Sequence, residues 1–178
     1  MSADRLRLFV ALELPDAARE ELLRWRAGAS DRLRLLAPDA LHATLCFLGW
    51  QESDELDAIA AACEVVAGLP AVALSLGRGI WLPSRVPRVL AVELRGPLED
   101  VQSALSDALT SGGWYRPEQR PYLAHITVAR VPKGVRIRQP ELPEPRPLRF
   151  TGSHITLFRS RLSPAGARYE PLHRVKLG

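Results

Sequence analysis

The 178-residue sequence has few cysteines, very little lysine and no long apolar run. Its two cysteines, Cys46 and Cys63, are too few for a disulfide framework or a structural zinc site. The most apolar stretch, residues 58–76, is interrupted by a glutamate, a glycine and a proline, so it cannot form the ~20-residue span that a bilayer requires. The polar start, residues 1–5, leads into an apolar run that is too short for a signal peptide. We therefore expect a cytoplasmic protein without membrane contact.

Positive charge is unevenly distributed along the chain. The formal net charge is +4, but residues 1–112 hold 11 Arg against 16 Asp and Glu, whereas residues 113–178 hold 11 Arg and 2 Lys against 4 acidic residues. A basic C-terminal third suggests a polyanionic partner, most often a nucleic acid, although a solvated basic face fits the charge alone equally well. The preference for arginine over lysine favours bidentate contacts if phosphates are bound.

Apolar patterning predicts short strands mixed with helices. We expect strands near residues 6–14, 41–48, 72–76, 88–94, 123–131, 154–160 and 169–175. Helices are expected over residues 15–29, from a Ser53 cap with a stripe reaching residue 67, and from residue 97 to 109. Residues 132–147 hold five prolines and are expected to form a long basic loop. Without regular βαβ spacing, this order favours an α+β fold.

The two halves of the chain resemble each other. RVLAVEL at residues 88–94 echoes FVALEL at residues 9–14, with the Glu-Leu pairs 80 residues apart. A helix and a further strand follow in each half. We interpret the chain as one domain over residues 1–178, built from a duplicated strand–helix–strand unit.

Two His-x-Thr-x motifs stand at nearly the repeat spacing. His42 and Thr44 lie in one predicted strand, and His125 and Thr127 lie in another, 83 residues further on. Because side chains alternate along a strand, each histidine shares a face with its threonine. If the halves pack about a pseudo-twofold axis, two imidazoles and two hydroxyls face each other across a groove.

This arrangement suits acid–base catalysis of phosphodiester cleavage. A neutral imidazole takes a proton from the attacking oxygen, and a protonated imidazole gives one to the leaving oxygen. An ordinary histidine pKa near ~6.5 makes both forms available near neutrality. The threonine hydroxyls can donate to phosphate oxygens, and the scheme requires no metal or other cofactor.

A third copy of the motif, starting at His154, has no place in the repeat. We interpret it as structural, or as lying at the rim of the groove.

Phe47 and Arg130 stand five residues after the two repeat histidines, where strict alternation places them on the opposite face. They join the site only if the strands bend, bulge or end there. Alternation instead puts the small Cys46 and Ala129 on the histidine face, where they would leave room for substrate.

With these residues in view, the chain resembles the two-histidine (2H) phosphoesterase superfamily, and most closely its RNA 2′,3′-cyclic phosphodiesterase branch, often called 2′-5′ RNA ligase. The likeness spans RLFVALELP, LHATLCFLG, RVLAVEL, RPYLAHITVAR and FRSRLSPAGARYEPL. It implies two pseudo-symmetric, interleaved lobes, each a mostly antiparallel sheet with helices packed outside, around a central groove.

The same resemblance implies hydrolysis of a terminal 2′,3′-cyclic phosphate of RNA to a 2′-phosphomonoester, by a protein that we expect to be a monomer. It assigns protonation of the leaving 3′ oxygen to His42 and activation of water to His125. It places Thr44, Thr127 and Arg130 on the phosphate and Phe47 against a base; the residues by themselves do not distinguish the acid from the base.

Three other functions are consistent with parts of the sequence. Ligation would have to reverse cleavage without ATP, because no Gly-x-x-x-x-Gly-Lys loop is present and the two lysines, Lys133 and Lys176, make a nucleotidyl-lysine improbable. A cysteine hydrolase would need Cys46 paired with His125 and has no evident orienting acid. A non-catalytic RNA-binding module would use the basic third and keep the histidines as relics; two intact motifs favour the enzyme.

Overall fold

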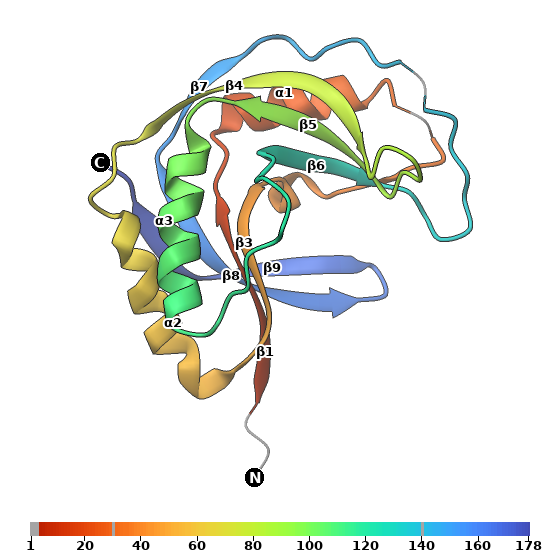
Figure 1. The fold of residues 1–178 in the computed structure, drawn as a ribbon. Coiled ribbons are helices and arrows are strands. Elements are labelled where there is room, and N and C mark those ends of the chain that lie inside the picture. Colours follow the sequence, from red (N-terminus) through yellow and green to blue (C-terminus); the bar gives the residue numbers. More distant parts are fainter. Residues whose placement is uncertain (1–3, 30, 140) are drawn as a thin grey trace.

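Two antiparallel sheets and three α-helices make up the protein, as seen in the computed structural model, which describes residues 4–29, 31–139 and 141–178 (Figure 1). Met1 to Ala3, in the predicted polar start, and Pro140, in the predicted loop, lie outside the described residues. The α+β prediction is confirmed. No helix within the described ranges is long and apolar enough to cross a bilayer.

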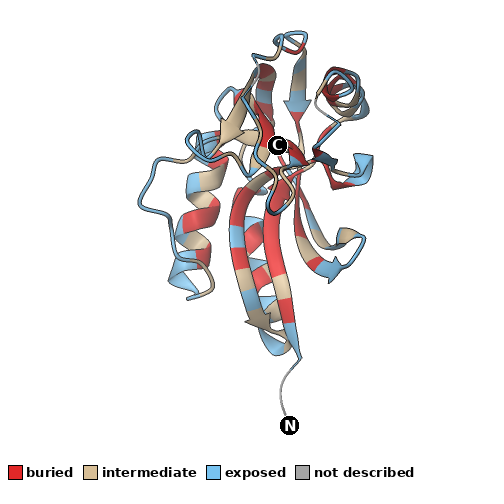
Figure 2. Cartoon of the chain, turned by 90° about the vertical axis from the view of Figure 1, so that its right-hand side faces the viewer, coloured by how far each residue is buried: buried red, intermediate tan, exposed pale blue. Residues whose placement is uncertain are grey.

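The first sheet has four strands in the order β3-β1-β8-β9. Their bounds are Ala43–Glu52 for β3, Arg5–Leu12 for β1, His154–Ser163 for β8 and Gly166–Lys176 for β9. β1 is buried along most of its length (Figure 2), because it is paired on both edges and residues 8–12 are buried on both faces. Residues far apart in sequence therefore meet beside β1.

The second sheet has five strands in the order β2-β6-β5-β4-β7. These are Arg34–Leu35 for β2, His125–Arg130 for β6, Val89–Arg95 for β5, Val72–Leu82 for β4 and Arg149–Gly152 for β7. β6 pairs with β5 as β3 pairs with β1, so each histidine motif lies beside the first strand of its own half; β3 is an edge strand, whereas β6 also pairs with β2. The duplication itself stays an interpretation, which this topology supports.

Two of the helices each follow a strand of one sheet but pack against the other sheet. α1 (Asp16–Arg26) follows β1 but contacts β6, whereas α3 (Leu98–Ser111) follows β5 but contacts β3. α2 (Leu56–Cys63) packs against α3 (Figure 1). The buried stripe of α3 comprises Leu98, Val101, Leu105 and Leu109, as the sequence predicts. The exchange of helices buries apolar faces of both sheets in one continuous core.

Some predicted elements were wrong in extent. Ser53 does not cap α2; it begins a short 3₁₀ helix, Ser53–Glu55, and α2 ends at Cys63 instead of reaching residue 67. A further 3₁₀ turn, Glu64–Val66, follows α2, and another, Pro38–Ala40, precedes β3. β4 runs past residue 76 because a register shift between Leu76 and Gly79 lets pairing with β5 continue. Strands β2 and β7 were not predicted, whereas the described residues of 132–147 form neither helix nor strand, as expected.

Candidate active site

The two repeat histidines occupy equivalent positions. His125 is the first residue of β6, and His42 directly precedes β3. The Nδ1 of His42 lies 2.8 Å from the carbonyl oxygen of Ala40, and that of His125 lies 2.7 Å from the carbonyl oxygen of Leu123. A carbonyl oxygen only accepts, so Nδ1 is the protonated nitrogen of each neutral ring. In both residues Nε2 is therefore the unprotonated nitrogen, the one that can accept a proton.

A β-bulge follows each histidine at the same distance. In the ladder with β1, Cys46 pairs with Val10 and Thr44 with Ala11, so Leu45 is an extra residue. In the ladder with β5, Ala129 pairs with Leu90 and Thr127 with Ala91, which leaves Val128 extra. Each bulge stands three residues after its histidine, and each shifts the alternation of side chains by one residue.

The bulges explain which residues face the site. Residues 43–47 and 126–130 share one burial pattern, in which the two residues at and after the bulge are buried and the fifth is exposed. Phe47 and Arg130 are therefore turned toward the histidines. The sequence placed them in the site only if the strands bend, bulge or end there, and both strands bulge. The expectation that Cys46 and Ala129 share the histidine face was wrong, because the extra residue turns both into the core.

Burial of Cys46 also bears on the cysteine-hydrolase alternative. Loss of solvent, with a smaller contribution from Cys63, raises the pKa of the Cys46 thiol to about 12. A thiol with this pKa is not the thiolate that nucleophilic attack requires at neutral pH. Cys46 is therefore a core residue.

One pocket of about 120 Å³ brings together all six residues singled out in the sequence. His42, Thr44 and Phe47 come from the first half, and His125, Thr127 and Arg130 from the second. Five more residues line it that sequence reasoning missed: Arg7, Phe9, Leu36, Ser160 and Tyr169. Arg7 and Phe9 are two apart on β1, as alternation allows, but no spacing in the sequence relates Ser160 or Tyr169 to the repeat.

Aromatic rings surround one histidine. The ring of His42 lies 4.9 Å from that of Phe9 and 5.2 Å from that of Tyr169, measured between centroids. Burial removes water from the His42 ring and lowers its pKa to about 4. The hydrogen bond to Ala40 opposes this shift, and the charges of Arg130 and His125 add smaller contributions in the same direction as burial. Unprotonated Nε2 accepts a hydrogen bond from the Thr44 hydroxyl at 2.9 Å. His42 of the free protein is thus neutral at pH 7.

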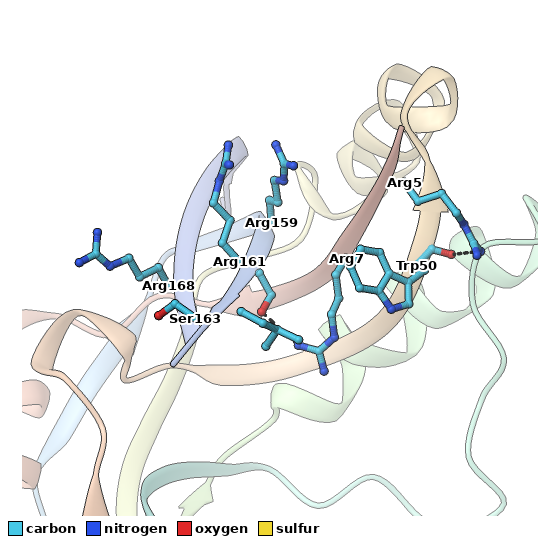
Figure 3. Close-up of a pocket in the computed structure, with 9 residues that line it drawn as sticks. Arg5, Arg7, Trp50, Arg159, Arg161, Ser163 and Arg168 are labelled. Carbon is cyan, nitrogen blue, oxygen red and sulfur yellow. Dashed lines mark hydrogen bonds between the residues drawn. The ribbon is translucent and has the colours of Figure 1, made fainter. Parts of the chain in front are cut away.

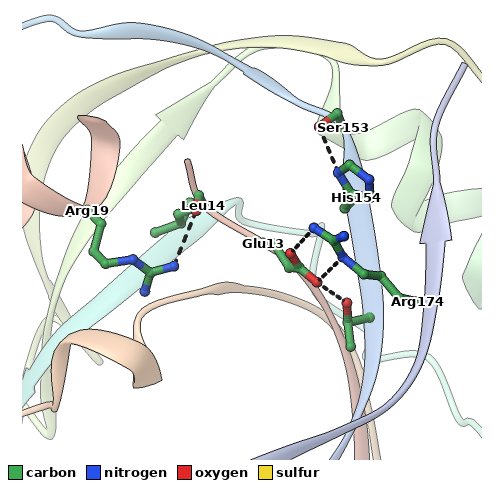
Figure 4. Close-up of polar contacts among 7 residues, drawn as sticks. Glu13, Leu14, Arg19, Ser153, His154 and Arg174 are labelled. Carbon is green, nitrogen blue, oxygen red and sulfur yellow. Dashed lines mark hydrogen bonds and ion pairs between the residues drawn. The ribbon is translucent and has the colours of Figure 1, made fainter. Parts of the chain in front are cut away.

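The third motif lies away from this pocket and has different partners. Nδ1 of His154 lies 2.9 Å from the Ser153 hydroxyl, and the buried Thr156 donates to the Glu13 carboxylate (Figure 4). Arg174 donates to both oxygens of Glu13, at 2.9 and 2.8 Å. Although burial opposes it, these bonds from Arg174 and Thr156 lower the pKa of Glu13. The arrangement is a satisfied polar network that links β8, β9 and the end of β1.

Fold and site together define a phosphoesterase-type centre with paired histidines. The sequence matches the family model of the 2′-5′ RNA ligase superfamily over residues 14–164, and the chain belongs to this family. The RNA 2′,3′-cyclic phosphodiesterase of Escherichia coli K12 is 32% identical over 94% of each chain.

Solved structures show the same fold. The protein TT0787 of Thermus thermophilus superposes with a TM-score of 0.85 at 25% identity, covering 97% of this chain and 98% of that one. E. coli LigT in complex with 3′-AMP superposes with a TM-score of 0.84 at 29% identity, covering 98% and 99%. The family resemblance inferred from the sequence is thereby confirmed.

Proposed function

We propose that this protein hydrolyses the 2′,3′-cyclic phosphate at the end of an RNA strand and leaves a 2′-phosphomonoester. The observation that carries the proposal is the pair of imidazoles that line one pocket, each with Nδ1 bonded to a backbone carbonyl and with Nε2 as its basic nitrogen. The names of the matched relatives support the choice of substrate, and one structural relative was solved in complex with a nucleotide, 3′-AMP.

In this mechanism the two rings divide the proton transfers. Nε2 of His125 takes a proton from water as its oxygen attacks phosphorus. The bond from phosphorus to the 3′ oxygen breaks, and Nε2 of His42 gives that oxygen a proton. The products are a 3′-hydroxyl and a 2′-phosphate, and each transfer is typically worth ~10²–10⁴ in rate.

The acid role of His42 depends on the substrate. Burial keeps this ring neutral in the free protein, so its proton must be stabilised when the phosphate binds. A phosphodiester anion between the two rings would offset the repulsion from Arg130 and raise the pKa of His42. Substrate binding thus prepares the acid, and the protonated form is populated where it is needed.

The remaining pocket residues position the substrate. Thr44, Thr127 and Arg130 would hold the non-bridging phosphate oxygens, with Arg130 supplying a charged, bidentate contact. Phe47, with 48% of its surface exposed, presents a ring on which the terminal base can stack. Both histidines come from one chain, so a monomer suffices for the reaction.

Product analysis tests the proposal directly. The protein is incubated with a short RNA ending in a 2′,3′-cyclic phosphate, and the products are compared with 2′- and 3′-phosphate standards. We expect catalytic turnover to the 2′-phosphate alone. Binding without turnover would establish an RNA-binding module instead, and a 3′-phosphate product would reverse the assignment of the leaving oxygen.

A second experiment separates the acid from the base. In a cyclic substrate whose 3′ oxygen is replaced by sulfur, the leaving thiolate needs no proton. His42→Ala should then lose much less activity than it does with the oxygen substrate, whereas the loss in His125→Ala should stay the same. The opposite pattern would exchange the two roles.

A further inference from the structure

A second hollow opens where two neighbouring strands separate. Within the described residues, β1 pairs with β8 from Leu8 to Leu12, opposite Ile155–Arg159. Before Leu8, β1 stays paired with β3, whereas β8 beyond Arg159 stays paired with β9. The two pairs of strands diverge, as Figure 1 shows, and the hollow of about 510 Å³ lies between them.

The walls of this hollow are strongly basic. No carboxylate is among the described residues that line it, and its side chains include an exposed tryptophan and five arginines (Figure 3): Arg5, Arg7, Arg159, Arg161 and Arg168. Arg7 and Ser160, joined by a 3.1 Å hydrogen bond, also line the catalytic pocket. The hollow therefore adjoins the catalytic pocket, and Arg7 and Ser160 form the wall between them.

Part of this positive charge is not neutralised. Arg5 pairs with Glu52 at 3.1 Å, and Arg161 pairs with Glu170 at 2.9 Å. Within the ranges that the structure describes, neither Arg159 nor Arg168 has a carboxylate partner. An anion entering the hollow would find free guanidinium groups without having to break an ion pair.

The tryptophan reaches this face through a second irregularity in β3. Phe47 and Trp50 are three residues apart, which strict alternation would place on opposite faces. The ladder with β1 skips Leu48, since Leu8 pairs with Gly49 and Phe9 with Phe47. Trp50, 53% exposed, is therefore presented on the same side as Phe47, at the hollow instead of the catalytic pocket.

Arg7 connects the two rings. It is the cross-strand partner of Trp50, and its guanidinium lies 4.7 Å from the centre of the Phe47 ring. Because a strand rises about 3.3 Å per residue, Phe47 and Trp50 are separated by at most about 10 Å along β3. Alternating aromatic and guanidinium groups along a groove are the features that bind single-stranded nucleic acid, by stacking bases and contacting phosphates.

We propose that this hollow binds the single-stranded RNA on the 5′ side of the terminal nucleotide, with Trp50 stacking on a base and Arg159 and Arg168 contacting phosphates. The inference rests on the proposed function and makes the protein an enzyme that acts preferentially on oligonucleotides. The exposed strand edges in the hollow could also pair with a peptide, but the excess of arginine and the shared wall with the catalytic pocket favour an RNA strand.

The experiment compares two substrates with the same reacting end: adenosine 2′,3′-cyclic monophosphate and a single-stranded hexanucleotide ending in that group. The first is too short to extend from the catalytic pocket into the hollow. We expect the wild-type kcat/KM to be at least tenfold higher for the hexanucleotide. Trp50→Ala should lower kcat/KM for the hexanucleotide about tenfold, the scale of a lost base stack. Its kcat/KM for the mononucleotide should stay within twofold of wild type.

Salt dependence tests the arginines. Loss of one phosphate contact should reduce the slope of log KM for the hexanucleotide against log salt concentration by ~0.7 in Arg168→Gln or Arg159→Gln. Arg149→Gln is the matched control, because this exposed arginine lies outside both pockets. It is on β7, an edge strand of the five-stranded sheet. Its slope should equal that of the wild type.

The outcomes separate the two proposals. If the wild type hydrolyses neither substrate, the proposed function fails. If it hydrolyses both with equal kcat/KM, or if Trp50→Ala affects both equally, the proposed function stands and the RNA-binding hollow is refuted. A hexanucleotide held in a duplex with a complementary strand should lose the advantage, and undiminished preference for it would also refute the stacking role of Trp50.

Discussion

The two halves of the active site have the same backbone but different surroundings. In each half, Nδ1 of the histidine contacts the carbonyl oxygen two residues earlier. In each half, the strand bulges three residues after the histidine. Because the bulge determines which side chain faces the pocket, both halves present a histidine, a threonine and the fifth residue after the histidine.

The halves differ in what is placed around this common frame. The fifth residue is Phe47 in one half and Arg130 in the other. His42 packs between the rings of Phe9 from β1 and Tyr169 from β9, and this environment lowers its pKa to about 4. No corresponding rings contact His125 among the described residues. A symmetric backbone thus places two identical side chains, and neighbouring strands give them different surroundings, as the separate acid and base roles that we propose would require.

The largest expected effect comes from removing either imidazole. His42→Ala and His125→Ala should each lower kcat on an RNA 2′,3′-cyclic phosphate by ~10²–10⁴, because each removes one proton transfer. His154→Ala is the matched control, since it has the same local motif but lies outside the pocket. Steady-state rates of all three variants, with circular dichroism to verify folding, make the comparison. Equal losses at all three positions would contradict the assignment of the catalytic pair.

Arg130 tests the charged half of the comparison. Arg130→Gln should lower kcat/KM by about ten- to a hundredfold, the range expected for losing a hydrogen bond to a charged group. Arg130 is exposed at the end of β6, so thermal unfolding should stay near that of the wild type. A large drop in melting temperature would instead make Arg130 a structural residue.

Tyr169 tests the aromatic half. Tyr169→Ala should admit water beside His42 and raise the pKa of that imidazole from about 4 toward its ordinary value of 6.5. Titration of the histidine ring protons by NMR measures this shift. An unchanged pKa would mean that the packing of Tyr169 does not cause the difference between the two halves.

The same variant has a consequence for stability. Because the folded-state pKa of His42 lies below its unfolded value, the unfolded chain binds more protons between about pH 4 and pH 6.5. This contribution to stability is fully present above pH 6.5 and is lost as the pH falls toward 4. Denaturant unfolding at pH 7 and pH 5 should therefore show a smaller acid-induced loss in Tyr169→Ala than in the wild type.

Much of the site could be predicted because its chemistry is local in sequence. The two motifs recur at the spacing of the repeat, so packing of the two halves about a pseudo-twofold axis was enough to predict that they converge. Alternation alone could not place Phe47 and Arg130, since one extra residue in a ladder reverses the faces beyond it. The same reversal buried Cys46, which alternation had placed beside the histidines. Nothing in the local sequence marks Leu45 or Val128 as the bulged residue.

Residues that enter from other strands could not be found in this way. Tyr169 and Ser160 reach the pocket because β8 and β9 pair alongside β1, a long-range contact with no periodic signal. Conversely, His154 shows that a local motif does not suffice. β8 pairs with β1 without a register shift, and its threonine is consumed by a bond to Glu13. Such a motif contributes to a site only when its strand and its neighbours turn it toward one.

The smallest expected effect is that of a chelator. A metal ion held between the two imidazoles would make them equivalent ligands, and the difference between the halves would then have no catalytic meaning. In the mechanism proposed here, His125 removes a proton and His42 supplies one, while Arg130 balances the phosphate charge. EDTA should therefore change kcat/KM by less than twofold. A tenfold loss that is restored by a divalent cation would replace paired acid–base catalysis with a metal-activated water.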